Sequence, residues 1–484
     1  MRSLISFRFV ISLVVMIGLL AACAPAAPAE PVVQEPAPVV ETEAPVEEVA
    51  PVEEAAPTEE VVVTEEVAPT EEVAAPEEPA MEPVTIQVFY PVAVDAPIAS
   101  ILNGYIEDFQ AEYPHITVEP VYSGGYADVQ TAIQTTIDGG GEPPALAVLL
   151  ATSLYDLINA DYIAPLDGYV DAMEDGAAYV EDFLPAFLAN SYYDDQLWSI
   201  PFQRSAVVMY YNVDKFAEAG IEPPTSWQSW ADAAQALTVT EGDTTNWGMK
   251  FSSDWPYWLF QPLAIGAGQN ILEDDCTVVF DDPAVIEAVQ FYIDLSAVYG
   301  AMPAGVQASW PTDPTDLASG ATAMIAHSSA SLSSILSQAD FEVGVMPYPG
   351  KEEGTYASVP GGGNFYILKG AAPEKQEAAW KFIEFLTRPD YVADFSIQTG
   401  YIANRFSAYE TEAMLAYVAE VPQALATRDA LRYAGAELMT QNLAQVRGIF
   451  HDYIQRAING EMSAADAMAA AQQEAEAALA DYCQ

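Results

Sequence analysis

The chain has 484 residues, of which 71 are Asp or Glu and only 15 are Lys or Arg, so its formal net charge is −56. A chain this acidic lacks the clustered Lys and Arg that neutralise phosphates, which excludes nucleic acid as a partner, and its field does not steer anionic ligands toward it. About 400 residues of mixed composition follow the first 83, and this length exceeds what one hydrophobic core usually serves, so two lobes are expected.

The N-terminus has the layout of an export signal. Two arginines stand among the first eight residues, an apolar run covers residues 9–20, and small residues precede Cys23. The apolar run is shorter than the roughly 20 residues of a membrane span. The sequence LAAC that ends at Cys23 resembles the bacterial lipobox, in which the cysteine is acylated and becomes the new N-terminus. We therefore expect residues 1–22 to be a lipoprotein signal peptide; an ordinary signal peptide or a membrane anchor is the alternative.

Residues 23–83 are expected to be the acylated cysteine and a disordered spacer. After Cys23 this segment repeats variants of APVEEVAPVEE, with 17 Glu and no Lys, Arg or aromatic residue. Such a composition cannot bury enough apolar surface to fold, and charge repulsion with proline stiffness keeps it extended. The expected purpose is to lift a domain off a membrane, and an acidic interaction tail is the alternative.

The first part of the folded region alternates strands and helices. Residues 84–92 form an expected strand, and the apolar positions between 98 and 109 recur with helical spacing. A second strand over 116–124, a helix over 126–137 and an apolar strand over 145–151 follow. A strand that is apolar on both faces within such an alternation predicts a parallel α/β sheet.

Further strands are expected over 206–212, 321–327 and 341–349, and the last 120 or so residues read as mainly helical. Ser463 with Asp466 predicts the N-cap of the final helix. The two remaining cysteines, Cys276 and Cys483, are free to pair in an exported protein, but their spacing leaves the pairing open.

Three long stretches resemble one family. They are VTIQVFYPV…LNGYIEDFQAEYPHITVEPVYSGGYADV, MYYNVDKFAEAGIEPPTSWQSWADAAQAL and EAAWKFIEFLTRPDYVADFSIQTGYIANRFSAYE. In this order they resemble the family 1 extracellular solute-binding proteins of ABC importers, over nearly all of residues 84–484. QTGYIANRFSAYE and QVRGIFHDYIQRAINGEMSAADAM are most similar to the glycerol-3-phosphate-binding branch and its sugar-binding relatives.

The resemblance implies an α/β, two-lobed periplasmic-binding-protein-like fold of type II, with discontinuous lobes joined by hinge strands. Lobe I would comprise residues 84–204 and 360–410, and lobe II residues 205–359 and 411–484. Ligand would bind in the interlobe cleft, the lobes would close around it, and the permease subunits of the importer would read the closed state.

Aromatic and glycine-rich stretches are candidate parts of that cleft, because a neutral polyol needs flat apolar faces for stacking. Trp255 and Trp258 stand between turn residues with no clear helix, and cleft and core remain equal alternatives for them. Trp230, inside an amphipathic pattern, is expected in the core. The PGGGNFYI stretch lacks the context of a dinucleotide or phosphate loop. The family resemblance implies a hinge with ligand-facing backbone centred on Gly362, and a hinge alone is the alternative.

The resemblance also places ligand contacts at individual positions. Tyr126, Ser205, Ser329, Tyr401 and Arg447 match ligand-binding residues of the glycerol-3-phosphate branch. A helix N-cap is the alternative role for the serine run around Ser329. A structural salt bridge is the alternative for Arg447.

One position departs from that branch. Where the branch carries an acidic ligand-binding residue after its third strand, this chain has Leu150. The missing carboxylate disfavours glycerol phosphates, so a sugar or oligosaccharide is the expected ligand. Glycerol-3-phosphate or its diesters are the alternative.

The residues do not favour catalysis. The chain has no G-x-S-x-G motif, and its three histidines have no metal-ligand spacing. The acidic stretch over residues 273–283 is interpreted as a solvated turn. We therefore expect no catalytic residue, metal or cofactor, and a tethered glycan hydrolase is the less favoured alternative. The expected protein is a monomeric, extracytoplasmic lipoprotein that contacts a carbohydrate, a permease and, through its lipid, the cell membrane.

Overall fold

The computed structural model describes residues 81–483, so the predicted signal peptide, Cys23 and nearly all of the predicted spacer lie outside the described residues. Within residues 81–483, no helix is long and apolar enough to cross a membrane.

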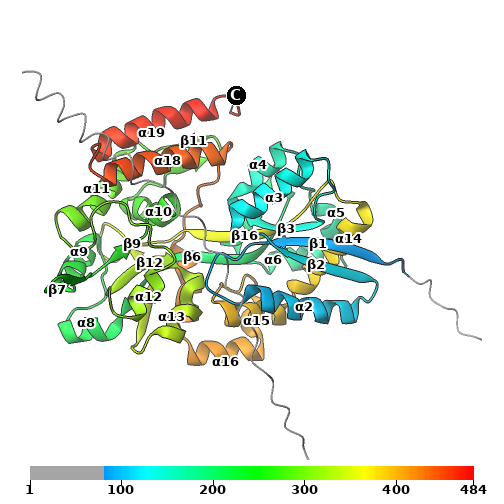
Figure 1. The fold of residues 1–484 in the computed structure, drawn as a ribbon, viewed down its shortest axis with the longest axis horizontal. Coiled ribbons are helices and arrows are strands. Elements are labelled where there is room, and N and C mark those ends of the chain that lie inside the picture. Colours follow the sequence, from blue (N-terminus) through cyan, green and yellow to red (C-terminus); the bar gives the residue numbers. More distant parts are fainter. Residues whose placement is uncertain (1–80, 484) are drawn as a thin grey trace, which may run out of the picture. The chain divides into compact units, whose positions relative to one another are not determined.

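An eight-stranded mixed sheet runs through the described region (Figure 1). Its strand order is β2-β1-β3-β16-β6-β12-β9, and β13 also pairs with β6. The strands are β1 (Val84–Tyr90), β2 (Ile116–Tyr122), β3 (Leu146–Leu150), β6 (Ile200–Asn212), β9 (Lys250–Phe251), β12 (Met324–Ser328), β13 (Val343–Met346) and β16 (Pro360–Ile367).

The first half of the sheet is the parallel arrangement that the sequence predicts. Strand β1 pairs in parallel with β2 and β3, and all five residues of β3 are buried. Helix α2 (Ile98–Glu112) buries six apolar side chains, which are the predicted face: Ile98, Ile101, Leu102, Tyr105, Ile106 and Phe109. The prediction for this half is confirmed. It depends only on the spacing of apolar residues, which specifies the side of each element that is buried.

The second half is mostly antiparallel. Strand β6 is 13 residues long, and its first part pairs with β16 while its last part pairs with β12 and β13, all three antiparallel to it. The apolar patterns predict these strands correctly but not their direction. The order of apolar and polar residues along a strand shows which side chains are buried, not whether the neighbouring strand runs parallel or antiparallel. The consequence is that β6 and β16 join the two halves of the sheet.

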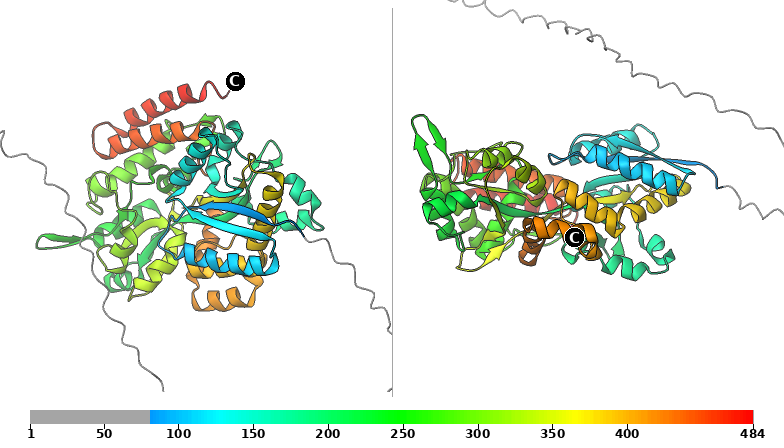
Figure 2. Two further views of the ribbon diagram at one scale, coloured as in Figure 1. Left: turned by 45° about the vertical axis from the view of Figure 1, so that its right-hand side comes forward. Right: turned by 90° about the horizontal axis from the view of Figure 1, so that it is seen from below.

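Helices surround both halves of the sheet (Figures 1 and 2). Beside β1 to β3 lie α2, α3 (Tyr126–Asp138), α4 (Leu154–Asn159), α5 (Asp167–Ala172), α6 (Gly176–Glu181) and α14 (Pro373–Leu386). Helix α7 (Pro185–Leu188) contacts β6 and β16, and α15 (Pro389–Thr399) packs against α2 and α14. The remaining helices are α8 (Val213–Ala219), α9 (Trp227–Ala236), α10 (Pro256–Ala267), α11 (Pro283–Ala297), α12 (Asp313–Ala318), α13 (Leu332–Gln338), α16 (Glu412–Glu420), α17 (Gln423–Asp429), α18 (Leu443–Ile458) and α19 (Ala464–Leu479).

Short elements complete the described region. Four two-stranded hairpins are β4 (Tyr192–Tyr193) with β5 (Gln196–Leu197), β7 (Val239–Glu241) with β8 (Thr244–Asn246), β10 (Leu272–Asp274) with β11 (Thr277–Val278), and β14 (Tyr348–Pro349) with β15 (Tyr356–Ala357). Four 3₁₀ turns are η1 (Ala151–Ser153), η2 (Ser329–Ser331), η3 (Ser407–Glu410) and η4 (Ala430–Tyr433).

The two halves of the sheet have separate hydrophobic cores. One core gathers side chains from β1, β2, β3, α2 and α14, and the other from α9, α10, α11, α18 and α19. Trp230 is fully buried in the second core, as its helical pattern predicts. Trp255 is half-buried and packs against both cores, so it lies where they meet.

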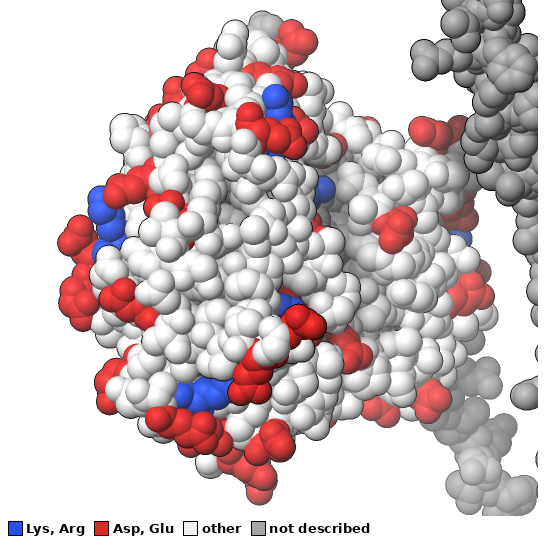
Figure 3. All heavy atoms as spheres, turned by 60° about the vertical axis from the view of Figure 1, so that its left-hand side comes forward, with Lys and Arg blue, Asp and Glu red and all other residues white. Residues whose placement is uncertain are grey.

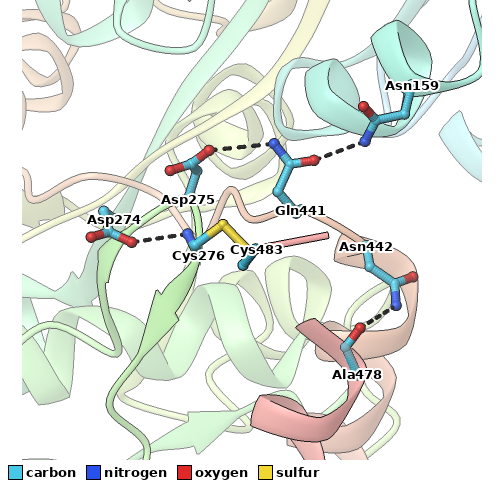
Figure 4. The surroundings of a disulfide bond; sticks show 8 residues. All are labelled: Asn159, Asp274, Asp275, Cys276, Gln441, Asn442, Ala478 and Cys483. Atoms are coloured by element: carbon cyan, nitrogen blue, oxygen red, sulfur yellow. Dashed lines mark hydrogen bonds between the residues drawn. A yellow bond between two sulfur atoms is a disulfide. The ribbon is translucent and has the colours of Figure 1, made fainter. Parts of the chain in front are cut away.

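A disulfide fastens the C-terminus (Figure 4). Helices α18 and α19 pack side by side, and Ser463 caps α19 by accepting a hydrogen bond from the Asp466 amide at 3.1 Å, as predicted. Beyond α19, Cys483 is bonded to Cys276 in the β10–β11 hairpin, 207 residues earlier. The pairing that the spacing leaves open is therefore formed.

The surface of the described region is acidic. On the face drawn in Figure 3, Asp and Glu side chains outnumber the few Lys and Arg side chains and spread over its periphery. Residues 84–484 carry −41 of the net charge of −56. Solubility and repulsion of anions follow from such a surface.

Candidate functional site

A cavity of about 50 Å³ lies between the two cores. Six aromatic side chains line it: Tyr126, Trp255, Tyr257, Trp258, Trp310 and Tyr401. Its polar lining residues are Ser205, Ser328 and Glu437. Tyr126 and Tyr401 belong to the first core, and Tyr257 and Trp258 to the second, so each core supplies one wall.

Six of the eight residues singled out in the sequence line this cavity, namely Tyr126, Ser205, Trp255, Trp258, Gly362 and Tyr401. They come from α3, β6, α10, β16 and the segment after α15, which are far apart in the chain. Leu150, at the end of β3, lies in the same lining. The structure therefore places Leu150, where this chain lacks the acidic residue of the glycerol-3-phosphate branch, beside the predicted ligand-binding residues.

Ser329 does not line the cavity. Its hydroxyl accepts a hydrogen bond from the Ala206 amide at 2.9 Å, and its side chain is fully buried. The neighbouring Ser328 lines the cavity instead and also accepts a bond from the Ala330 amide at 3.2 Å. Of this serine run, Ser328 lies in the cavity lining, whereas the predicted Ser329 fastens η2 to β6.

Arg447 also lies outside the lining. Its guanidinium on α18 stands over the Tyr257 ring, 5.6 Å from the ring centroid, and Tyr257 lines the cavity. Burial raises the pKa of Tyr257 to about 12, the nearby Glu437 charge adds to this rise, and Arg447 offsets part of it. Arg447 therefore contacts the lining residue Tyr257 but does not itself line the cavity.

The glycine run of β16 supports both walls. Gly362 has φ +98°, and a Cβ there would lie 1.9 Å from the carbonyl oxygen of Gln203, so only glycine fits. At Gly361 a Cβ would meet the Trp258 ring, and at Gly363 the Tyr126 ring. The absence of side chains at Gly361 and Gly363 thus lets one aromatic ring from each wall approach the β16 backbone closely.

Trp258 lies within helix α10, and the expectation that no helix follows Trp255 is wrong. Proline occupies the first turn at Pro256 and recurs inside the helix at Pro262, which hides the helix in the sequence. The Trp258 indole donates to the carbonyl oxygen of Pro360 at 2.8 Å. The ring is thus fixed against β16 with one edge on the cavity.

The tyrosine wall has a side-chain hydrogen bond of its own. The Tyr126 hydroxyl donates to Gln203 Oε1 at 3.2 Å. Burial raises the pKa of Tyr126 and of Tyr401 well above the ordinary range, so both stay neutral. This wall presents neutral hydroxyl groups.

Trp310 and His327 extend the other wall, and sequence reasoning missed both. Their rings stack with centroids 3.9 Å apart, while His327 Nδ1 is 2.8 Å from the Ser331 hydroxyl and Nε2 is 3.0 Å from the Trp310 carbonyl oxygen. Burial lowers the pKa of His327 to about 4, so the imidazole is neutral at neutral pH. Its observed contacts position Trp310.

Glu437 was also missed, and it is the single acidic residue of the lining. It lies between η4 and α18, with 3% of its side chain exposed. Burial raises the pKa of Glu437 to about 8, although Arg204 and Arg447 offset part of the rise. Nothing marks Glu437 among the many acids of the sequence except its apolar surroundings, YAGAELM.

Arg204 is a buried charge behind the cavity. It is fully buried on β6, where Nη1 donates to Asn364 Oδ1 and Nη2 to Asn190 Oδ1, each at 3.0 Å. Burial lowers the pKa of its guanidinium, and the nearby Glu437 opposes that change. Its guanidinium is therefore fixed in place by the side chains of Asn364 and Asn190.

Within residues 81–483, no group of three His, Cys, Asp or Glu residues is arranged to hold a metal ion. The geometry that is present suits binding: aromatic faces, neutral hydroxyls and one carboxyl group surround a common space.

The family description "Bacterial extracellular solute-binding protein" matches residues 104–423. This chain belongs to that family. Solute-binding proteins of this kind capture small molecules outside the cytoplasm and deliver them to the permeases of ABC importers, so an extracytoplasmic binding role follows for this chain.

Curated relatives of this solute-binding protein are similar along most of their length. The sn-glycerol-3-phosphate-binding periplasmic protein UgpB of Pectobacterium atrosepticum is 24% identical over 413 residues, covering 80% of this chain and 90% of that protein. UgpB of Escherichia coli K12 is 25% identical over 402 residues, covering 78% and 88%.

Solved structures share the fold of this solute-binding protein. UgpB from Mycobacterium tuberculosis in complex with glycerophosphocholine aligns with a TM-score of 0.73 and 23% identity, covering 82% of this chain and 99% of that one. Maltose-bound MalE3 of T. maritima aligns with a TM-score of 0.71 and 21% identity, covering 81% and 99%. The fold is therefore the two-lobed, type II periplasmic-binding-protein fold, as predicted.

Proposed function

We propose that this solute-binding protein captures a neutral carbohydrate, a sugar or oligosaccharide, in the cavity between its two cores. The observation that carries the proposal is the lining: six aromatic rings, three polar residues and, within the described chain, no Lys or Arg. Aromatic faces stack against the apolar faces of sugar rings, and a few fixed polar groups orient the hydroxyls.

The space around the cavity supports an elongated ligand. A hollow of about 250 Å³ shares Ala93, Val94 and Trp310 with the cavity, and another of about 310 Å³ shares Glu437. The cavity itself, at about 50 Å³, has room for only a few water molecules. A sugar therefore enters only when the lobes part, and we propose lobe I over 84–204 and 360–410 and lobe II over 205–359 and 411–484.

Closure is proposed to take place about β6 and β16, since these strands pair along the junction of the two halves. Ligand would stabilise the closed state by contacting both walls at once, through Tyr126 and Tyr401 on one side and Trp255 and Trp258 on the other. Ser205 and Gly362, on the joining strands themselves, would contact the same ligand.

Glycerol-3-phosphate or a glycerophosphodiester is the second candidate. The names of the curated relatives and the glycerophosphocholine complex favour it. Leu150 in the lining opposes it, and so does the placement of Arg447 behind Tyr257, where it does not reach the cavity surface. An anion in this cavity would face the Glu437 carboxyl with no lining cation to balance it.

A thermal-shift screen separates the two candidates. The probes are maltose, maltotriose, tagatose, sn-glycerol-3-phosphate and glycerophosphocholine, each added to the purified protein. A ligand at 100 times its Kd stabilises the folded state by about 2.7 kcal/mol, which raises the unfolding midpoint measurably. We expect one or more saccharides to raise the midpoint, and a rise with the two phosphates alone would overturn the carbohydrate proposal.

We also propose that the protein does not alter its ligand. The lining contains one carboxyl group, whereas a glycoside hydrolase of the common type uses two that flank the scissile bond. Prolonged incubation with maltotriose, followed by chromatography, should return unchanged maltotriose; release of maltose or glucose would contradict this and favour a tethered hydrolase.

The lipid anchor at Cys23 is part of the proposal and rests on the lipobox resemblance. Cys23→Ser should move the protein from the membrane fraction to the soluble fraction and abolish labelling by a radioactive fatty acid. Cys276→Ser is the matched control, because its partner is Cys483, and it should leave both fractionation and labelling unchanged. Unaltered labelling of the Cys23→Ser protein would refute the anchor.

A further inference from the structure

Glu437 is buried and yet incompletely satisfied. Only 3% of its side chain is exposed, and its Oε2 atom has no hydrogen-bond partner among the described residues. The residue lines both the central cavity and the hollow of about 310 Å³ beside it. A buried carboxyl oxygen without a partner is costly, so its persistence at a cavity wall needs a reason.

The backbone on both sides of Glu437 is held by one buried amide. Gln261, fully buried in α10, donates from Nε2 to the Ala436 carbonyl oxygen at 2.7 Å and accepts at Oε1 from the Leu438 amide at 3.1 Å. Asn270 adds a second bond to the Ala436 carbonyl oxygen at 2.9 Å. These bonds fix the position from which the Glu437 side chain projects.

The charged and titratable groups that face Glu437 come from several elements. Arg204 on β6 and Arg447 on α18 act on it electrostatically, and the hydroxyls of Tyr126, Tyr257 and Tyr366 lie within the range of its charge. Within residues 81–483, however, none of the ion pairs shorter than 4 Å includes Glu437. The two guanidiniums therefore moderate its charge without occupying its oxygens.

We propose that Glu437 is the specificity-determining carboxyl group of the cavity, which accepts hydrogen bonds from vicinal hydroxyls of a neutral carbohydrate. This inference rests on the proposed function and names the chemistry behind it. Leu150, in the same lining, cannot accept a hydrogen bond, so Glu437 supplies from the second core the carboxyl group that the first wall lacks. Hydroxyl donors favour the charged form of a carboxyl, so ligand binding should also expel a proton from Glu437.

The alternative is a structural role, with Glu437 kept only as a distant counter-charge for Arg204. Glu437→Gln distinguishes the two, because it preserves shape and removes the carboxyl group that ionises when hydroxyls bind to it. We expect the affinity for the saccharide that stabilises the wild type most, among maltose, maltotriose and tagatose, to fall about 10- to 100-fold, the range for bonds to a charged group. The unfolding midpoint of the free protein should stay the same or rise.

Glu273→Gln is the matched control for Glu437→Gln. Glu273 lies in the lining of the same neighbouring hollow as Glu437 but does not line the cavity, and its side chain is exposed. Glu273→Gln should change neither affinity nor midpoint. A lowered midpoint with unchanged saccharide affinity in Glu437→Gln would assign Glu437 the structural role and overturn the proposal.

Proton release gives a readout that a structural role would not move. Isothermal titration with the same saccharide at pH 7.5, in phosphate and in Tris, should give different apparent enthalpies for the wild type, because the two buffers take up the released proton with different heats. The two enthalpies should coincide for Glu437→Gln. Equal enthalpies in the wild type would contradict proton release from Glu437.

The failure of the proposed function is distinguishable from failure of this inference. If sn-glycerol-3-phosphate alone binds, the carbohydrate proposal fails, and Glu437 is judged by whether Glu437→Gln weakens that binding, because the glycerol part also carries two vicinal hydroxyls. Unchanged binding in that case overturns the inference as well. If none of the five probes binds, a raised midpoint in Glu437→Gln supports a carboxyl retained at a cost in stability, and a lowered midpoint overturns it.

Discussion

The two walls of the cavity satisfy their polar groups in different ways. On the wall built by the first core, the Tyr126 hydroxyl donates to Gln203 Oε1, and Leu150 adds no polar group. On the opposite wall, Trp258 is tied to β16, while Glu437 keeps an oxygen without a partner in the described chain.

The difference distinguishes polar groups that already have a hydrogen-bond partner in the protein from a polar group that is free to bond to a ligand. A hydroxyl that already has a partner in the empty cavity, as Tyr126 has, gains little when ligand arrives, whereas an unpartnered buried carboxyl oxygen gains a full hydrogen bond. We therefore expect changes on the tyrosine wall to affect mainly stability and changes at Glu437 to affect mainly binding.

The largest expected effect is the pH dependence of the free energy of unfolding, which Glu437 should influence. Burial raises the pKa of Glu437 to about 8, so between about pH 5 and 8 the unfolded chain has released this proton while the folded chain retains it. Wild-type stability should fall as pH rises through this window and level off above it. Glu437→Gln removes the penalty, which amounts to up to about 5 kcal/mol for a rise in pKa from 4.5 to about 8 at about 1.36 kcal/mol per pH unit. Urea unfolding of both proteins at pH 5, 6.5 and 8 measures it, and a difference that is constant with pH would show that Glu437 does not titrate in this window.

Gly362→Ala should break both walls at once, because β16 supports Trp258 and Tyr126 together. The positive φ and the 1.9 Å contact with the Gln203 carbonyl oxygen predict a loss of about 3 kcal/mol or more in the free energy of unfolding. Gly268→Ala is the control, because Gly268 has φ +110° and no atom within 4 Å of its added Cβ. It should cost about 1 kcal/mol, and equal losses in the two variants would deny the close approach at β16.

Removal of the disulfide tests whether stability and binding are separable. The double change Cys276→Ser with Cys483→Ser opens a very long loop and should lower the free energy of unfolding by about 2–4 kcal/mol. Neither cysteine lines the cavity, so ligand affinity should stay within about twofold of the wild type. A large loss of affinity measured by titration would mean that the C-terminal attachment shapes the cavity.

The smallest expected effects compare one ring from each wall. Trp258→Phe keeps an aromatic face but loses the hydrogen bond to Pro360, and we expect a loss of about 5- to 10-fold in saccharide affinity. Tyr401→Phe leaves a ring in the lining and removes only its hydroxyl, so a loss of about 2- to 3-fold in saccharide affinity is expected. Titration calorimetry ranks the two, and the reverse order would invert the roles assigned to the walls.

Much of this architecture follows from local patterns. The buried face of α2, the two-sided burial of β3 and the N-cap at Ser463 all depend on residues near in sequence, and each is present as predicted. Family resemblance adds positions such as Tyr126 and Tyr401, which converge on one cavity although 275 residues separate them.

The remaining parts depend on contacts that no local pattern carries. Glu437 is exceptional only because Gln261, 176 residues earlier, and two distant arginines surround it. The choice between Ser328 and Ser329 depends on which hydroxyl meets the Ala206 amide. Helix α10 is obscured by its prolines, since helix signals count Pro262 as a breaker while tertiary packing tolerates it.

The most direct test of the central claim is isothermal titration of the purified protein at pH 7.5 with maltotriose, followed by titration of a fresh sample with sn-glycerol-3-phosphate. The account predicts saturable binding of maltotriose that is weakened at least about 10-fold by Glu437→Gln, and no saturable binding of sn-glycerol-3-phosphate. Saturable binding of sn-glycerol-3-phosphate, with none of maltotriose, would contradict it.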